Sequence, residues 1–177
     1  MRKSLFFALL FAFVLPFTAP KAQAQFVLVP YVGYNIEDGF GPLVGIGAEF
    51  VAPFELSNLD LSIMPSAEYV FSEDFGSGDA AVSTSVFQIN GDVIAKFAPS
   101  GSIAPFAGAG LAYVVFNVDS DFAGVDFSSS DIGINLLGGV TFPGALAIGE
   151  PYAMGRLTLA DGSAISIIGG IRIPLGE

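Results

Sequence analysis

The clearest feature of this sequence is an alternation of apolar and polar residues between Leu59 and Phe71. Apolar or small side chains occupy every second position, namely Leu59, Leu61, Ile63, Pro65, Ala67, Tyr69 and Phe71. The positions between them include Asp60, Ser62, Ser66 and Glu68. Because successive side chains of a strand point to opposite sides, this segment predicts a strand with one apolar and one polar face.

The same alternation recurs along the chain and predicts eight strands. We place them at residues 26–36, 43–52, 59–72, 84–98, 103–118, 131–142, 151–160 and 164–175. Tilted strands that cross a bilayer need about 9–11 residues, whereas strands of soluble proteins more often have about five or six. The predicted fold is therefore all-β, an eight-stranded antiparallel up-and-down transmembrane β-barrel.

Sorting the strand positions by parity separates charged from apolar side chains. The polar face carries Glu49, Asp60, Glu68, Asp92, Lys96, Arg156 and Arg172, with Gln88, Asn90 and Asn135. In a membrane barrel these charges face the lumen, where they either pair with one another or line a narrow pore. The alternative is a secreted soluble barrel that binds an apolar ligand. Its exterior would carry too few charges to keep it in solution.

Composition and the N-terminal segment favour an exported membrane protein. Only 13% of residues are charged, about half of the roughly 25% usual in soluble domains. Arg2 and Lys3, the apolar residues 5–17 and the motif Ala22-Gln23-Ala24 predict a cleaved signal peptide over residues 1–24. The barrel domain then covers residues 25–177. No later apolar run reaches the ~18 residues of a spanning helix, and the chain has no cysteine.

Charge and residue usage exclude several functions. The predicted mature chain keeps three basic residues against seventeen acidic ones, so nucleic acid is not an expected partner. The chain lacks histidine, the usual general base of barrel enzymes, and we predict no catalytic residue and no enzymatic activity. Lys96 follows Asp92 by four residues on the same strand face, which favours an ion pair in the lumen over catalysis.

The acidic connections all fall at one end of the predicted barrel, which is the outer end if the N-terminus is periplasmic. They carry Glu37, Asp38, Glu73, Asp74, Asp79, Asp119, Asp121, Asp126, Asp131 and Asp161. Asp119, Asp121 and Asp126 are candidate contacts for a cation or a partner. Their loop matches a calcium motif poorly, since Ala123 stands where that motif has Asp or Asn and Ser130 stands where it has Glu. No metal site and no cofactor is predicted.

Aromatic residues lie near the predicted strand ends, where membrane barrels carry their interfacial girdles. The set is Tyr31, Tyr34, Phe71, Phe97, Phe116, Phe142 and Tyr152. We predict that they face the membrane interface.

Two segments carry a family resemblance. PYVGYN at Pro30–Asn35 and PFAGAGLAY at Pro105–Tyr113 resemble recurrent segments of the OmpA/OmpX-like eight-stranded barrels, the "porin family" outer membrane beta-barrel domain. The resemblance covers Gln25 to Glu177. It implies the outer membrane of a diderm bacterium and assembly by the barrel insertion machinery. Outer-membrane lipid and lipopolysaccharide are the other expected partners, and of the open oligomeric states a monomer is favoured. Such chains commonly end in an aromatic residue, whereas this sequence ends IPLGE.

The function predicted from the sequence is a non-enzymatic one, in envelope integrity or surface interaction. An eight-stranded barrel has an interior just filled by side chains, which favours a lumen plugged by paired charges. The alternative is a small passive pore for ions or small solutes, whose lining would be the same charged residues.

Overall fold

The computed structural model describes residues 26–36, 40–56, 59–72, 82–97, 102–120 and 127–175. At residues 40, 52–56, 72, 82–84, 118–120 and 127 it describes the backbone only. The predicted signal peptide lies outside the described residues. The part of the chain that is described contains no helix long and apolar enough to cross a membrane.

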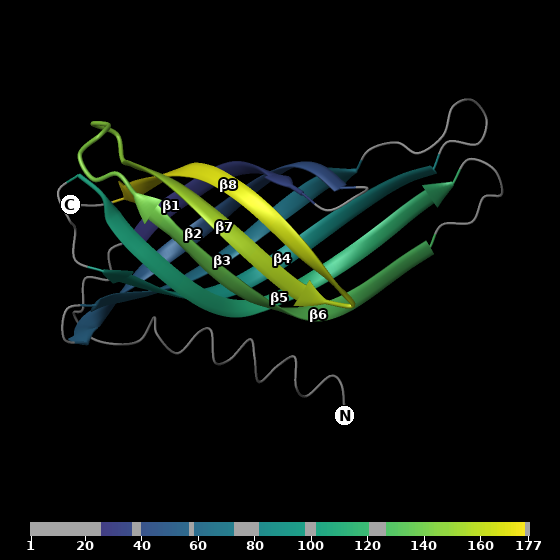
Figure 1. Ribbon diagram of the computed structural model, residues 1–177, viewed down its shortest axis with the longest axis horizontal. Helices are drawn as coiled ribbons and strands as arrows, with labels where there is room; N and C mark the ends of the chain where they lie inside the picture. The colour runs from purple at the N-terminus through teal and green to yellow at the C-terminus, as the bar shows by residue number, and fades with distance from the viewer. Residues whose placement is uncertain are drawn as a thin grey trace.

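Eight antiparallel strands form one closed barrel, as predicted (Figure 1). They are β1 (Phe26–Asn35), β2 (Phe40–Leu56), β3 (Leu59–Ser72), β4 (Val82–Phe97), β5 (Ala104–Ser120), β6 (Phe127–Thr141), β7 (Glu150–Ala160) and β8 (Gly162–Leu175). Each strand pairs with its sequence neighbours, and β1 pairs with β8 to close the sheet. The bounds of β3 are those predicted, and the other strands differ from the prediction by one to four residues.

The barrel has two distinct ends. At one, which we call the turn end, lie Phe26, Leu175 and the β6–β7 turn of residues 142–149. At the other, the loop end, lie the connections between β3 and β4 and between β5 and β6. The β7–β8 hairpin also turns there, at Asp161, and Gly162 adopts a φ of +156°. Only glycine adopts this conformation readily, which explains the Asp-Gly pair at so tight a turn.

The strands β2, β4, β5, β6, β7 and β8 extend further than predicted at one or both ends, and this corrects two assignments. Asp119 belongs to β5 and Glu150 begins β7, whereas the sequence pattern put both outside the strands. Asp131, predicted to begin its strand, lies within β6, which already begins at Phe127. The β5–β6 ladder continues through Asn117 opposite Ser128 to Val118 opposite Phe127. The serines at positions 128–130 end the apolar alternation, but their backbone still pairs with β5. A prediction from hydropathy alone therefore made these strands too short.

Apolar side chains cover the outside of the barrel, and the strand charges lie inside. Large apolar residues such as Ile46, Ile134 and Ile167 are half or more exposed, whereas Glu49, Glu68 and Arg156 are buried. This orientation is the reverse of that in a soluble barrel. The lumen also contains apolar side chains, among them Val29, Leu43, Met64 and Ile168.

Three of the aromatic residues predicted for the interface lie inside instead. Tyr31 and Tyr152 are buried, and Phe116 packs against the interior cluster. Tyr34, Phe71 and Phe97 are exposed on the outer surface, and Phe142 is half-buried.

Glycines opposite the interior rings provide the space that those rings occupy. Tyr31 pairs with Gly45 in register, and a Cβ atom at Gly45 would lie 2.2 Å from Cζ of the tyrosine ring. Two further pairs have the same arrangement, Tyr152 with Gly170 and Phe106 with Gly139. An aromatic ring can lie flat across a neighbouring strand only where that strand lacks a side chain. The glycines therefore determine which way these aromatics point.

We predict that Gly45→Ala destabilises the barrel by about 1–3 kcal/mol, because the new methyl group displaces the Tyr31 ring from a filled interior. Equilibrium urea unfolding in detergent, followed by far-ultraviolet circular dichroism, measures this. The matched control is Gly155→Ala, whose added Cβ meets nothing within 4 Å. Equal stability of the two variants would contradict the proposed role of the glycine. The penalty is also expected to shrink when Tyr31→Ala removes the ring.

Candidate functional site

The first group of lumen charges lies toward the turn end and centres on Glu49 of β2. Lys96 of β4 donates a hydrogen bond to Glu49 Oε1, and Arg172 Nε of β8 donates to Glu49 Oε2 at 2.8 Å. Arg172 Nη1 also donates to Oε2 of Glu150 at 3.1 Å. The Glu49 side chain is only 1% exposed. One buried carboxylate thus joins two cations from strands on different sides of the lumen.

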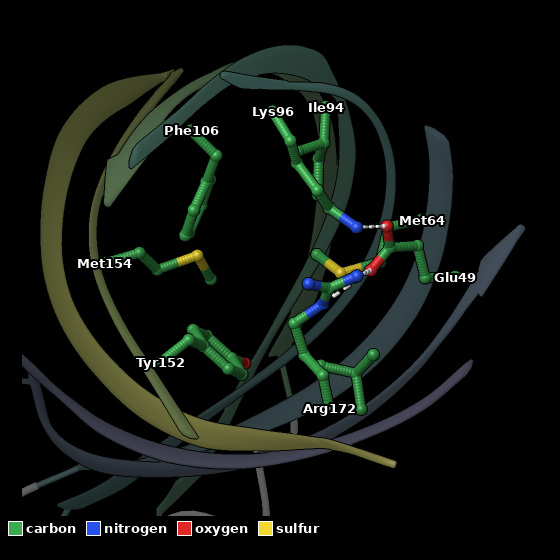
Figure 2. A pocket seen from close by; sticks show the side chains of 9 residues that line it. Glu49, Met64, Ile94, Lys96, Phe106, Tyr152, Met154 and Arg172 are labelled. Carbon is green, nitrogen blue, oxygen red and sulfur yellow. Dashed lines mark hydrogen bonds and ion pairs between the residues drawn. The ribbon is translucent and has the colours of Figure 1, made fainter. Parts of the chain in front are cut away.

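Apolar side chains surround this group. Figure 2 shows Phe106, Met154 and Tyr152 facing Lys96, Glu49 and Arg172 across the barrel. The cavity between them has a volume of about 20 Å³. A space of this size holds about one water molecule, so the lumen is filled at this level.

The second group is the ion pair of Arg156 and Glu68, from β7 and β3. Arg156 Nη2 donates to Glu68 Oε1, and the two side chains are 2% and 1% exposed. The Tyr31 hydroxyl donates to the other carboxylate oxygen, Glu68 Oε2, at 2.9 Å. Both oxygens of Glu68 are therefore engaged, by groups from two other strands.

Side-chain amides form the third group. Asn135 Nδ2 of β6 donates to Asn90 Oδ1 at 2.8 Å and to Asp92 Oδ1 at 3.0 Å. The Thr158 hydroxyl donates to Asn135 Oδ1 at 2.9 Å, and Gln88 Nε2 donates to Asn90 Oδ1 at 2.5 Å. Amides carry both donors and acceptors, so they link neighbouring strands without adding charge.

The structure brings six of the seven predicted lumen charges into the interior. Glu49, Glu68, Asp92, Arg156 and Arg172 are buried there, and Lys96 is half-buried. Asp60 is exposed, since it lies near the start of β3, where it lines an open hollow at the turn end.

The sequence pattern suggested the wrong partner for Lys96. Its ammonium binds Glu49, and Asp92 accepts a hydrogen bond from Asn135 instead. Residues four apart on one strand are separated by about 13 Å, which is too far for an ion pair. Glu49 belongs to β2, which is separated from β4 by β3 alone, so the contact depends on how these three strands pair.

Sequence reasoning missed three members of these groups, Glu150, Thr158 and Tyr31. Thr158 has the parity of Arg156 and could have been found by including hydroxyl side chains on the inward face. Glu150 shares its parity with Tyr152, Met154 and Arg156, all of which face inward. Extending β7 by one residue would have found it. Tyr31 carries no such signal, because the positions that flank it on β1 are apolar on both faces.

The acidic outer-loop candidates receive no structural description. Asp121 and Asp126 lie outside the described residues, and Asp119, next to the last residue of β5, has only its backbone described. Across the described ranges, no group of three or more His, Cys, Asp or Glu side chains is placed to hold a metal ion. The role of these three aspartates stays a prediction.

The three polar groups lie between two open hollows. One, of about 610 Å³, opens at the turn end and is lined by Asp60, Lys96, Glu150 and Arg172. The other, of about 270 Å³, opens at the loop end and includes Gln88 and Thr158 in its wall. No residue lines both hollows, and the Arg156–Glu68 pair lines neither.

Solved structures of bacterial outer-membrane barrels share this fold. Neisserial surface protein A matches with a TM-score of 0.63 and 16% identity, over 85% of this chain and 96% of its own. Ail, the attachment invasion locus protein of Yersinia pestis, has a TM-score of 0.57 and 14% identity, over 86% and 100%. The outer membrane enzyme PagL has a TM-score of 0.53 and 19% identity, over 84% and 99%.

No protein-family model and no curated protein matches the chain. Identities this low show a shared fold alone. The protein therefore has the eight-stranded fold of small outer-membrane β-barrels.

We predict that breaking the central ion pair costs more than removing it entirely. Arg156→Met should destabilise the barrel by about 3–5 kcal/mol, because it leaves the buried Glu68 carboxylate without its cation. Adding Glu68→Gln should restore most of that loss. Urea unfolding of both variants measures the difference, with Asp60→Asn at the exposed mouth as a control that should change little. Equal losses in the single and double variants would show that the pair makes no coupled contribution.

Proposed function

We propose that this protein is a non-enzymatic barrel of the bacterial outer membrane whose lumen is plugged, and that it acts in envelope integrity or surface interaction. The observation that carries the proposal is the Arg156–Glu68 pair, which crosses the middle of the lumen with both side chains nearly inaccessible. A passive pore of the same fold needs a continuous path between the two hollows, and this pair lies in its way.

The membrane location is supported by the outer surface. Exposed large apolar residues occur on every strand, including Val32, Ile46, Ile63, Ile89, Leu111, Ile134, Leu159 and Ile167. Such an exterior suits hydrocarbon, and a closed barrel leaves no unpaired sheet edge in the bilayer. The likeness in fold to outer-membrane proteins agrees with this placement. Outer-membrane lipid, including lipopolysaccharide, is then the proposed immediate partner of the exterior.

We propose the orientation that follows from a periplasmic N-terminus, as expected from the sequence. Phe26 and Leu175 both lie at the turn end. We therefore place the turn end in the periplasm and the loop end at the cell surface. Surface interaction would then involve the loop end, where the acidic candidates Asp119, Asp121 and Asp126 belong. Insertion by the barrel assembly machinery belongs to the same proposal.

The absence of enzymatic activity is proposed from the state of the interior carboxylates. Glu49 binds two cations, and Glu68 binds a cation and a tyrosine hydroxyl. A carboxylate whose two oxygens are both occupied by cations or hydrogen-bond donors is poorly placed to take a proton from a substrate.

We expect the refolded wild-type protein to insert into a planar lipid bilayer without producing resolved current steps. The double variant Glu68→Ala/Arg156→Ala removes the central pair but leaves the level of Glu49 filled. Adding Phe106→Ala and Met154→Ala opens that level as well, and this fourfold variant should produce small steps whose size increases with salt concentration. Asp60→Ala, which changes a charge at the mouth only, is the matched control and should stay silent.

Three results would contradict the proposal. Stable steps from the wild-type protein that change in Arg156 variants would make it a pore. Hydrolytic or transferase activity on outer-membrane lipids would make it an enzyme. Recovery as a folded monomer without detergent would exclude the membrane location.

A further inference from the structure

An apolar chamber lies inside the barrel at the loop end. Val70 of β3, Val86 of β4, and Val114 and Phe116 of β5 line one side of the 270 Å³ hollow. The three valines are buried, and Phe116 packs against the same interior cluster. Interiors of membrane barrels are usually polar where they meet water. This wall is apolar at the point where the lumen opens.

Two polar side chains at the floor of the chamber already have hydrogen-bond partners within the barrel. Gln88 donates its amide hydrogen to Asn90, and Thr158 donates its hydroxyl hydrogen to Asn135, so both groups are engaged by the plug below. Among the described residues that line the hollow, Asp161 alone is charged. The chamber therefore lacks the cations that an anionic ligand would need.

On the side opposite the valines, the barrel wall formed by β7 and β8 ends before the wall formed by β5 and β6. The ladder between β6 and β7 ends at Ile134 opposite Leu159, whereas β6 continues to pair with β5 as far as Val118 opposite Phe127. Figure 1 shows β5 and β6 extending beyond the β7–β8 hairpin at this end. The residues of the hairpin that line the hollow are small apart from Asp161, namely Ala160, Gly162, Ser163 and Ala164. We call these four residues the sill.

The outer side of the same hairpin belongs to the apolar exterior. Leu159, Ile165 and Ile167 are 41%, 52% and 60% exposed. Because side chains alternate, the lipid-facing residues and the sill are separated only by the thickness of one hairpin. An apolar molecule in the outer leaflet would thus find a second apolar surface on the inner side of the sill.

We propose that this chamber binds one acyl chain of an outer-leaflet lipid, which passes over the sill and contacts Val70, Val86, Val114 and Phe116. The inference rests on the membrane placement proposed above and adds a ligand site to it. A volume of 270 Å³ lies just below the roughly 300 Å³ at which pockets for drug-sized ligands begin. A single flexible chain suits such a space, whereas a sugar or peptide would leave its polar groups unpaired against valine side chains.

Fluorescence quenching by brominated lipid tests the site, because the chain contains no tryptophan of its own. Phe116→Trp places a single reporter in the chamber, and Leu136→Trp places one on the lipid-facing surface of β6. Each variant is reconstituted in phosphatidylcholine vesicles with or without bromine on the acyl chains. We expect bromolipid to reduce the fluorescence of both reporters. Adding Ala164→Phe, which narrows the sill, should abolish the loss at position 116 alone, and Ala164→Ser is the matched control.

Two outcomes distinguish failure of the site from failure of the membrane placement. If aqueous acrylamide but not bromolipid quenches the reporter at 116, while bromolipid quenches that at 136, the chamber is a water-filled vestibule and the inference is wrong. If bromolipid quenches neither, the membrane placement itself fails.

Unaltered protein gives an independent test in nanodiscs. Nuclear Overhauser effects from acyl protons to the methyl groups of Val86 and Val114 are expected, and effects confined to outward residues such as Ile165 would overturn the site.

Discussion

The pairing of β1 with β8 is the constraint on which the rest of the structure depends. Closing eight strands sets the width of the lumen at about that of the side chains it contains. Every inward residue must then fit against residues from strands far away in sequence. Three large rings are accommodated because a glycine stands opposite each of them, at Tyr31 with Gly45, Tyr152 with Gly170 and Phe106 with Gly139. A wider barrel would have no need of these matched pairs.

The same narrowness decides how charge is tolerated inside. Removing a carboxylate from water is costly unless a cation and further hydrogen bonds replace the water. Glu49 has two cations within reach, from β4 and β8, and Glu68 has a cation from the opposite strand β7 and a hydroxyl from β1. The amide network of Asn90 and Asn135 fills the remaining cross-section without adding net charge. The same ion pairs and hydrogen bonds therefore stabilise the barrel and fill its lumen.

Local pattern predicted the parts of this structure that depend on alternation. The bounds of β3 and the inward direction of Glu49, Glu68 and Arg156 follow from a period of two. The partners of those charges do not, because they depend on the stagger of the sheet around the barrel, which no single strand encodes. The prediction for Tyr31 was wrong for another reason. Because β1 is apolar on both faces, the alternation did not indicate which of its side chains point into the lumen. Its position depends on Gly45, a residue of a different strand.

A sealed middle divides the molecule into two independent ends. The turn-end hollow is lined by charges of both signs, including Asp60, Lys96 and Glu150, whereas the described wall of the loop-end hollow is mostly apolar or small. Under the proposed function, no solute passes from one to the other while the Arg156–Glu68 pair is in place. Without a common channel, residues that line one hollow can change without affecting what the other hollow binds or admits. The plug is thus what allows an apolar site at the loop end to coexist with a charged mouth at the turn end.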